Sequence, residues 1–185
     1  EASSTADDNG IPAYRIDGLL TDLDLFRRLR ARGQARGVSG LDDLIAALGL
    51  VAGPPFSQLR DNGWHWLFDG DPIDHIAECA IVDVAHLIST RALHEGDLDL
   101  ARSAAETAFR AVPGDEICRL DLVAVAAAEG HGDLAEERLA AEVFNRTDDD
   151  YGPPETAPRT RRVVDNLQWR GVDRRQRLTD SRGER

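Results

Sequence analysis

Apolar residues recur every three or four positions along most of the chain, and this spacing is typical of amphipathic helices. The pattern begins after Thr21 and is interrupted by short runs rich in Gly and Pro. It predicts helices over about residues 22–33, 41–50, 72–94, 97–112, 116–129, 133–144 and 159–169. Residues 13–17, AYRID, are a candidate short strand, and residues 56–71 fit a loop, a turn of helix or a brief strand. We therefore expect an all-α fold.

Local signals mark where the first two helices begin and where the second one ends. Thr21 with Asp24, and Ser39 with Asp42, have the spacing of a capping box, in which the two side chains satisfy backbone amides at a helix start. The sequence GPP at residues 53–55 cannot continue a helix. These signals predict a first pair of short helices before residue 53.

Two segments of the chain match each other at an offset of 34 residues. Residues 95–106, EGDLDLARSAAE, align with residues 129–142, EGHGDLAEERLAAE. The identical pairs are Glu95 and Glu129, Gly96 and Gly130, Asp99 and Asp133, Leu100 and Leu134, and Ala101 and Ala135. A helix, a Gly turn, a second helix and a Pro break at this period are typical of tetratricopeptide-type helical hairpins. Two unrelated hairpins of equal length are the alternative.

Each matched small residue has a mechanical role in this interpretation. Gly96 and Gly130 allow the tight turn between the helices of a hairpin. Ala101 and Ala135 let those helices approach closely, and Pro113 ends one unit so that the next can fold back.

The same interpretation extends to the start of the chain. Residues 41–50, LDDLIAALGL, resemble the second helix of an earlier, degenerate hairpin, paired with the helix over residues 23–32. The predicted fold is a set of tetratricopeptide-like antiparallel hairpins stacked as a short right-handed solenoid.

The two ends of the chain differ in composition from the predicted domain, residues 14–169. Residues 1–13 are small, polar and acidic, so we expect a disordered linker. Residues 170–185 are expected to be an Arg-rich frayed tail.

The chain carries a net charge of −12. Residues 159–185 carry +5, which leaves −17 on the other 158 residues and disfavours nucleic acid as their ligand. No apolar run is long enough to span a membrane, so no membrane contact is expected.

The order of these segments resembles the bacterial transcriptional activator domain of actinobacteria. The resemblance covers residues 14–169 and is carried by TDLDLFRRL, LDDLIAALGLVAGPPF, WHWL, a long helix, GDLDLARSAAETAFRAVPGDEICRLDLVAVAAAEGHGDLAEERL and RTRRVVDNL. That tetratricopeptide-like module follows a winged-helix domain in antibiotic regulatory proteins. It also occurs in membrane-anchored proteins that carry a LysM peptidoglycan-binding module.

The resemblance implies a non-enzymatic regulatory module that binds a protein partner, with a second copy of itself as one candidate. No helix-turn-helix precedes Tyr14, so we expect a fragment whose parent contacts DNA only through an upstream domain. The implied location is the cytoplasm, or the cytosolic part of a membrane-anchored protein. The alternatives are a small-ligand or metal-sensing domain, and the cytosolic domain of a LysM protein.

The search for chemistry finds no nucleophile elbow, phosphate loop or dinucleotide fingerprint, so we expect no catalytic residues and no cofactor. His75, Cys79, Asp83 and His86 lie on one predicted helix at spacings of four, four and three. Zinc and copper use such ligands, but a structural zinc site draws on more than one element. We expect Cys79 to face the core, with the histidines beside it, and therefore expect no metal site.

The chain has two cysteines. Cys79 and Cys118 both fall in apolar helical patterns, which predicts two reduced core cysteines.

Trp64, Trp66 and Phe68 fall within five positions and are the candidate partner-binding residues, because Trp anchors many interfaces. A structural plug between the first hairpin and the long helix is the other interpretation of these aromatics. His65, between the two tryptophans, reads as a loop residue.

Overall fold

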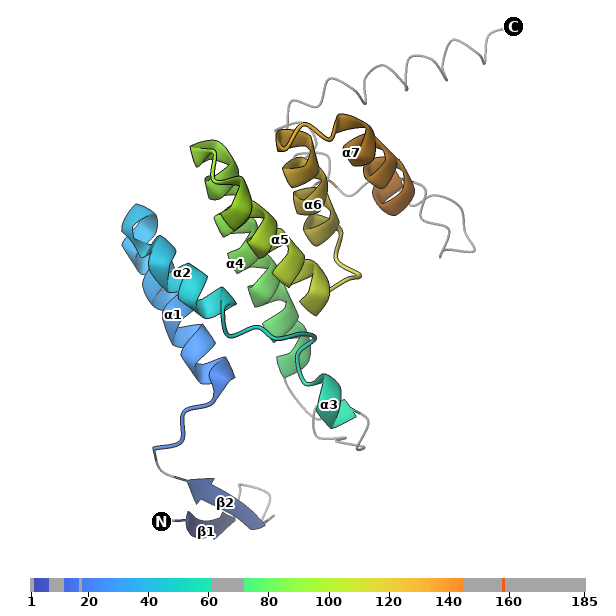
Figure 1. Cartoon of the computed structure of the whole chain (residues 1–185). Helices are drawn as coiled ribbons and strands as arrows, with labels where there is room; N and C mark the ends of the chain where they lie inside the picture. Colours follow the sequence, from blue (N-terminus) through green and yellow to red (C-terminus); the bar gives the residue numbers. More distant parts are fainter. Residues whose placement is uncertain (1, 7–11, 17, 61–71, 145–157, 159–185) are drawn as a thin grey trace, which may run out of the picture. The chain divides into compact units, whose positions relative to one another are not determined.

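The computed structural model describes residues 2–6, 12–16, 18–60, 72–144 and 158. In these residues the chain is predominantly helical, as predicted, with one small sheet in addition. The chain divides into two units, Glu1–Leu50 and Val51–Arg185, and each is described by itself (Figure 1).

The sheet lies at the start of the first unit. Strand β1 (Ala2–Ala6) pairs with strand β2 (Pro12–Ile16) in antiparallel register, with Ala2 opposite Ile16 and Ala6 opposite Pro12. The candidate strand at AYRID is therefore confirmed over its first four residues. The expected disordered linker over residues 1–13 is wrong for the parts that form strands. Composition misses such a pair because backbone hydrogen bonds, which any residue other than Pro can complete, hold it together.

The first unit also contains a helical hairpin. Helix α1 (Asp22–Arg36) and helix α2 (Leu41–Leu48) pack against each other, joined by the 3₁₀ turn η1 (Gly37–Gly40). The capping box at Thr21 is confirmed, because its hydroxyl accepts a hydrogen bond from the Asp24 amide at 3.1 Å. The start signal at Ser39 is wrong. Its hydroxyl donates to the Arg36 carbonyl at 3.1 Å, and α2 begins without a side-chain cap.

Two glycines and one buried acid hold this hairpin together. A Cβ on Gly33 would lie 2.9 Å from the Gly40 carbonyl oxygen, so the absence of side chains lets α1 and the turn touch. Asp43 is buried and accepts hydrogen bonds from Arg32 at 2.9 and 2.6 Å and from Arg36 at 3.2 Å. The Arg32 hydrogen bond holds the pKa of Asp43 below its ordinary value, and Arg36 adds to this against the opposing effect of burial.

The second unit is a series of helices that run alternately up and down (Figure 1). After the short α3 (Ser57–Arg60) come α4 (Ile73–Glu95), α5 (Leu98–Ala111), α6 (Glu116–Ala128), α7 (Gly132–Arg138) and the π-helical turn η3 (Leu139–Phe144). Each of the helices α4 to α7 packs on its successor, and α4 also packs on α6.

The α4–α5 and α6–α7 turns have the same backbone geometry. Gly96 and Gly130 adopt φ of 81° and 86°, the left-handed conformation that favours glycine. The amide after each glycine bonds to a carbonyl five residues back, Asp97 to Ala92 at 2.8 Å and His131 to Ala126 at 2.9 Å. This is the Schellman arrangement, here repeated at an offset of 34 residues.

Small side chains then bring the helices of each hairpin together. Ala101 and Ala135 are completely buried at equivalent positions of α5 and α7. Between the hairpins, Pro113 follows the end of α5, and its carbonyl accepts two hydrogen bonds from the Arg119 guanidinium at 3.1 and 3.0 Å. The described part of the second unit therefore contains two consecutive hairpins of like geometry. Their continuation as a right-handed solenoid stays a prediction.

Candidate functional site

Helix α4 exposes one continuous stripe of side chains, here called the α4 outer face. Residues three or four positions apart lie along a single line of a helix. Ile76 and Leu87 are 46% and 47% exposed, although both are large and apolar. The face consists of Ile76, Cys79, Asp83, Leu87, Thr90 and His94. Ile76 and Leu87 fit the helical spacing of apolar residues that would be expected to face a core, but the structure leaves both exposed.

At the flank of this face, a hydrogen bond fixes α4 on α6. His86 Nδ1 lies 2.8 Å from Asp121 Oδ1, a hydrogen bond between residues 35 apart in the chain. Asp121 is only 4% exposed, so its carboxylate needs such a partner. Sequence reasoning missed Asp121 because an acid in the middle of an apolar helix carries no local sign of its partner.

Ser89 lies one turn after His86 and does not join this pair. Its side chain is fully buried, and its hydroxyl has no hydrogen-bond partner among the described residues. A nucleophilic serine would be hydrogen-bonded to its base. The His86–Asp121 pair therefore acts as a structural contact between two helices in the part of the chain that is described.

Near this pair, α4, α5 and α6 meet at a cluster of small residues. Ala92, Ala101, Ala105 and Val125 form its centre, with Leu93, Leu100 and Leu122 packed around them. Helix α6 is covered by α4, α5, α7 and η3, so most of its side chains are buried. Of the two helices that open the hairpins in the described part of the chain, α4 has large apolar side chains that are exposed, Ile76 and Leu87, and α6 has none.

The two cysteines differ sharply, which corrects the prediction of two core cysteines. Both are free thiols, but Cys79 is exposed and Cys118 is completely buried. Burial, reinforced by the nearby charges of Asp115 and Asp121, raises the pKa of Cys118 to about 12. Since the thiolate is the reactive form, Cys118 is inert at neutral pH and Cys79 is the accessible sulfur.

The four candidate ligands weighed in the sequence, His75, Cys79, Asp83 and His86, do not come together as a set. His86 turns to Asp121, whereas the Cys79 sulfur lies 3.7 Å from His75 Nε2. Among the described residues, no group of three or more His, Cys, Asp or Glu side chains converges on a point that could hold a metal ion. The predicted partner residues Trp64, Trp66 and Phe68, with His65, lie outside the described residues, as does the Arg-rich tail over 170–185.

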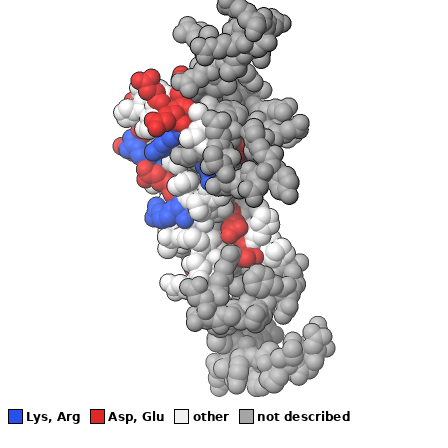
Figure 2. Space-filling view, turned by 90° about the vertical axis from the view of Figure 1, so that its right-hand side faces the viewer, with Lys and Arg blue, Asp and Glu red and all other residues white. Residues whose placement is uncertain are grey.

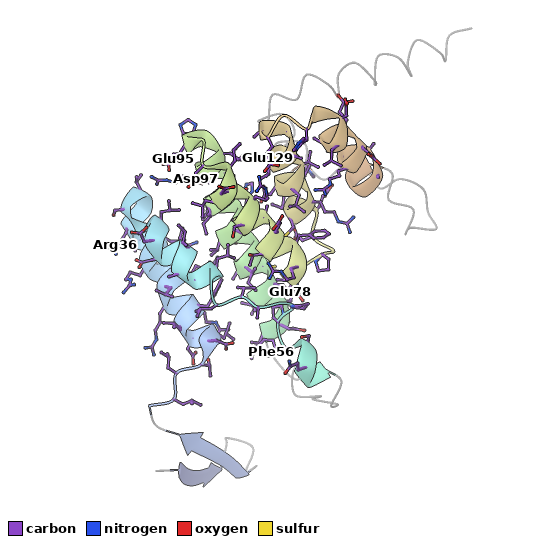
Figure 3. All side chains as sticks on the ribbon, viewed as in Figure 1. Arg36, Phe56, Glu78, Glu95, Asp97 and Glu129 are labelled. Carbon is purple, nitrogen blue, oxygen red and sulfur yellow. The ribbon has the colours of Figure 1, made fainter. Side chains whose placement is uncertain are left out.

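Charged side chains surround the turns of the second unit. Figure 3 places Glu95 and Asp97 beside the α4–α5 turn and Glu129 at the end of α6. Glu129 accepts a hydrogen bond from Arg102 Nε at 2.7 Å, which ties α5 to the end of α6. On the face seen in Figure 2, acidic and basic side chains lie next to one another, so the described surface there has no patch of one sign.

No family model matches this chain, and neither a curated protein nor a solved structure matches it. The resemblance to the transcriptional activator domain therefore stays a prediction from the order of the segments. No helix in the described ranges is long and apolar enough to cross a membrane.

Proposed function

We propose that this chain is a non-enzymatic protein-interaction module of a bacterial transcriptional regulator, working in the cytoplasm. The α4 outer face is its contact surface, and the hairpins hold that face rigid. The observation that carries the proposal is the exposure of Ile76 and Leu87 on one line of a long, well-anchored helix. Side chains of this type bind a partner by giving up their contact with water.

The repeated hairpin supports the same proposal from the scaffold side. Arrays of helical hairpins commonly bind protein segments, because each repeat rigidly presents a helix along an extended surface. Here the turns, the alanine contacts and the His86–Asp121 hydrogen bond all serve to place α4. None of them uses Ile76 or Leu87, the two exposed apolar side chains of the face.

Electrostatics favours a protein partner over nucleic acid. The 158 residues before the Arg-rich end carry −17, and a phosphate backbone is repelled by such a charge. The regulatory setting comes from the resemblance, in which a separate upstream domain would contact DNA. A partner with an apolar helix or loop fits Ile76 and Leu87 best.

Affinity capture with matched variants tests this function. The bait is the full chain, in the lysate of cells that carry its gene, with Ile76→Asp/Leu87→Asp as the test variant and Leu134→Asp as the control. Leu134 is 41% exposed on α7, so the control makes a similar change on another surface. Burying a carboxylate against an apolar partner weakens binding about 30-fold or more.

The expected result is a protein captured by the wild-type chain and by Leu134→Asp but lost from the α4 variant. Circular dichroism and thermal unfolding of the three baits must agree, which shows that the loss is not due to misfolding. Equal capture by all three baits, or no specific capture by any, would overturn the proposal.

A further inference from the structure

The exposed start of α4 holds two metal-ligating atoms at an unusual spacing. Cys79 Sγ lies 3.7 Å from His75 Nε2, one helical turn away. Tetrahedral zinc binds sulfur at about 2.3 Å and imidazole nitrogen at about 2.0–2.1 Å, which separates two such ligands by about 3.6 Å. The two atoms are therefore at nearly the distance that a single zinc ion requires.

The other nitrogen of the His75 ring is oriented in a way that suits a metal ligand. Nδ1 lies 3.8 Å from Glu78 Oε2, within the range of an ion pair. Histidines that bind metals commonly present the second ring nitrogen to a carboxylate, which fixes the ring and raises its basicity. The carboxylate of Glu78, which is labelled in Figure 3, is thus near Nδ1, whereas the sulfur is near Nε2.

Both ligands are accessible to a metal ion from solvent. The His75 side chain is 71% exposed, and Cys79 is the exposed thiol of the pair of cysteines. The sequence argument against a metal assumed that Cys79 faces the core, and the structure removes that assumption. The described residues bring no third ligand to the point, so these two side chains are half of a four-coordinate site.

We propose that His75 and Cys79 are half of a zinc site, which a second copy of this chain completes with the same two side chains. A two-fold axis through the ion then yields a Cys₂His₂ set, the composition of many structural zinc sites. Each thiol loses its proton on binding, so two protons are released for each Zn²⁺ bound and the two thiolates neutralise the ion. Ile76 and Leu87 lie on the same face, where a second copy covers them.

This site does not depend on the module binding a foreign protein. The test uses the purified full chain alone with zinc chloride, so its failure leaves the proposed function untouched. Titration calorimetry gives the stoichiometry, light scattering gives the mass, and cobalt(II) gives a thiolate-to-metal charge-transfer absorption. We expect one ion for two chains, a doubled mass, and reversal of both by a chelator.

The variants are Cys79→Ala and His75→Ala, with His131→Ala as the matched control. His131 is exposed and has a carboxylate oxygen of Glu129 at 3.6 Å from its Nδ1, but it has no thiol neighbour. The first two variants should lose the charge-transfer band or the doubled mass and weaken zinc binding about 100-fold, while the control keeps all three signals. Binding that survives Cys79→Ala, one ion bound to a monomer, or no binding by the wild-type chain would overturn the site.

Discussion

The hairpins α4–α5 and α6–α7 have the same backbone turn but opposite exposure of their first helices. Leu87 in α4 and Asp121 in α6 are separated by the repeat offset of 34 residues. Leu87 is 47% exposed, whereas Asp121 is 4% exposed. At equivalent positions, then, the chain exposes an apolar side chain and buries a charged one.

This difference distinguishes the residues that form the scaffold from those that we expect to bind a partner. Gly96 and Gly130 produce equal turns because backbone conformation alone requires glycine there. The helices differ because α6 packs against α4, α5, α7 and η3, whereas Ile76 and Leu87 of α4 are exposed. Function is therefore expected where the copies differ, on the outer face of α4.

The largest predicted difference between the hairpins concerns their leucines. Leu120 is completely buried in α6, so Leu120→Ala should lower the free energy of unfolding by about 2–5 kcal/mol through lost burial and a cavity. Leu87→Ala, on the exposed face of α4, should change it by about 0.5 kcal/mol or less. Urea unfolding of both variants measures the two values. Similar losses would mean that α4 is packed on its outer face as well.

The turns should respond alike to substitution. Gly96→Ala and Gly130→Ala each force alanine into a left-handed conformation, which costs about 1–2 kcal/mol. A Cβ at either position meets no atom within 4 Å, so conformation is the sole cost. Thermal unfolding of the two variants should show equal shifts to lower temperature. Unequal shifts would break the equivalence of the turns.

Ser89 offers a smaller effect of opposite sign. Its buried hydroxyl lacks a hydrogen-bond partner in the described ranges, so Ser89→Ala removes a desolvated polar group and should stabilise the protein by about 1 kcal/mol. Ser39→Ala is the control, because that hydroxyl is exposed and bonded to the Arg36 carbonyl. The denaturant midpoints of the two variants and the wild type measure these changes in stability. A destabilised Ser89→Ala protein would show that the hydroxyl has a partner.

The α1–α2 hairpin provides a third comparison, since an ion pair rather than a Schellman turn secures it. The pKa of Asp43 is lowered in the folded state, first by the Arg32 hydrogen bond. Its stabilising effect is therefore complete above the unfolded carboxyl pKa of about 4 and is lost as the pH falls through the folded value. The stability difference between wild type and Asp43→Asn should shrink toward zero on acidification. A difference that stays constant with pH would contradict the role of the ion pair.

Much of the helical framework follows from local sequence. The capping box at Thr21 and the turn at Gly96 are encoded within a few residues, so pattern alone finds them. The outer face of α4 could not be found in this way, because Ile76 and Leu87 fit a helical core pattern and local sequence does not tell which side of a helix is covered. Asp121 is the converse, since its burial depends on a histidine 35 residues away.

The orientation of Cys79 was missed for the same reason. Its position within an apolar helix favoured the core, but the angle of the residue around α4 places it on the exposed stripe. Local periodicity sets which residues share a line on a helix, and tertiary packing decides which line is covered.

The most direct test of the proposed function is site-specific photo-crosslinking of the full chain in cells that carry its gene. One variant carries a photo-reactive residue at Leu87 and the other carries it at Leu134, two exposed leucines on different helices. The account predicts an adduct with another protein chain from position 87 and none from position 134. Equal adducts from both positions, or an adduct from position 134 alone, would contradict it.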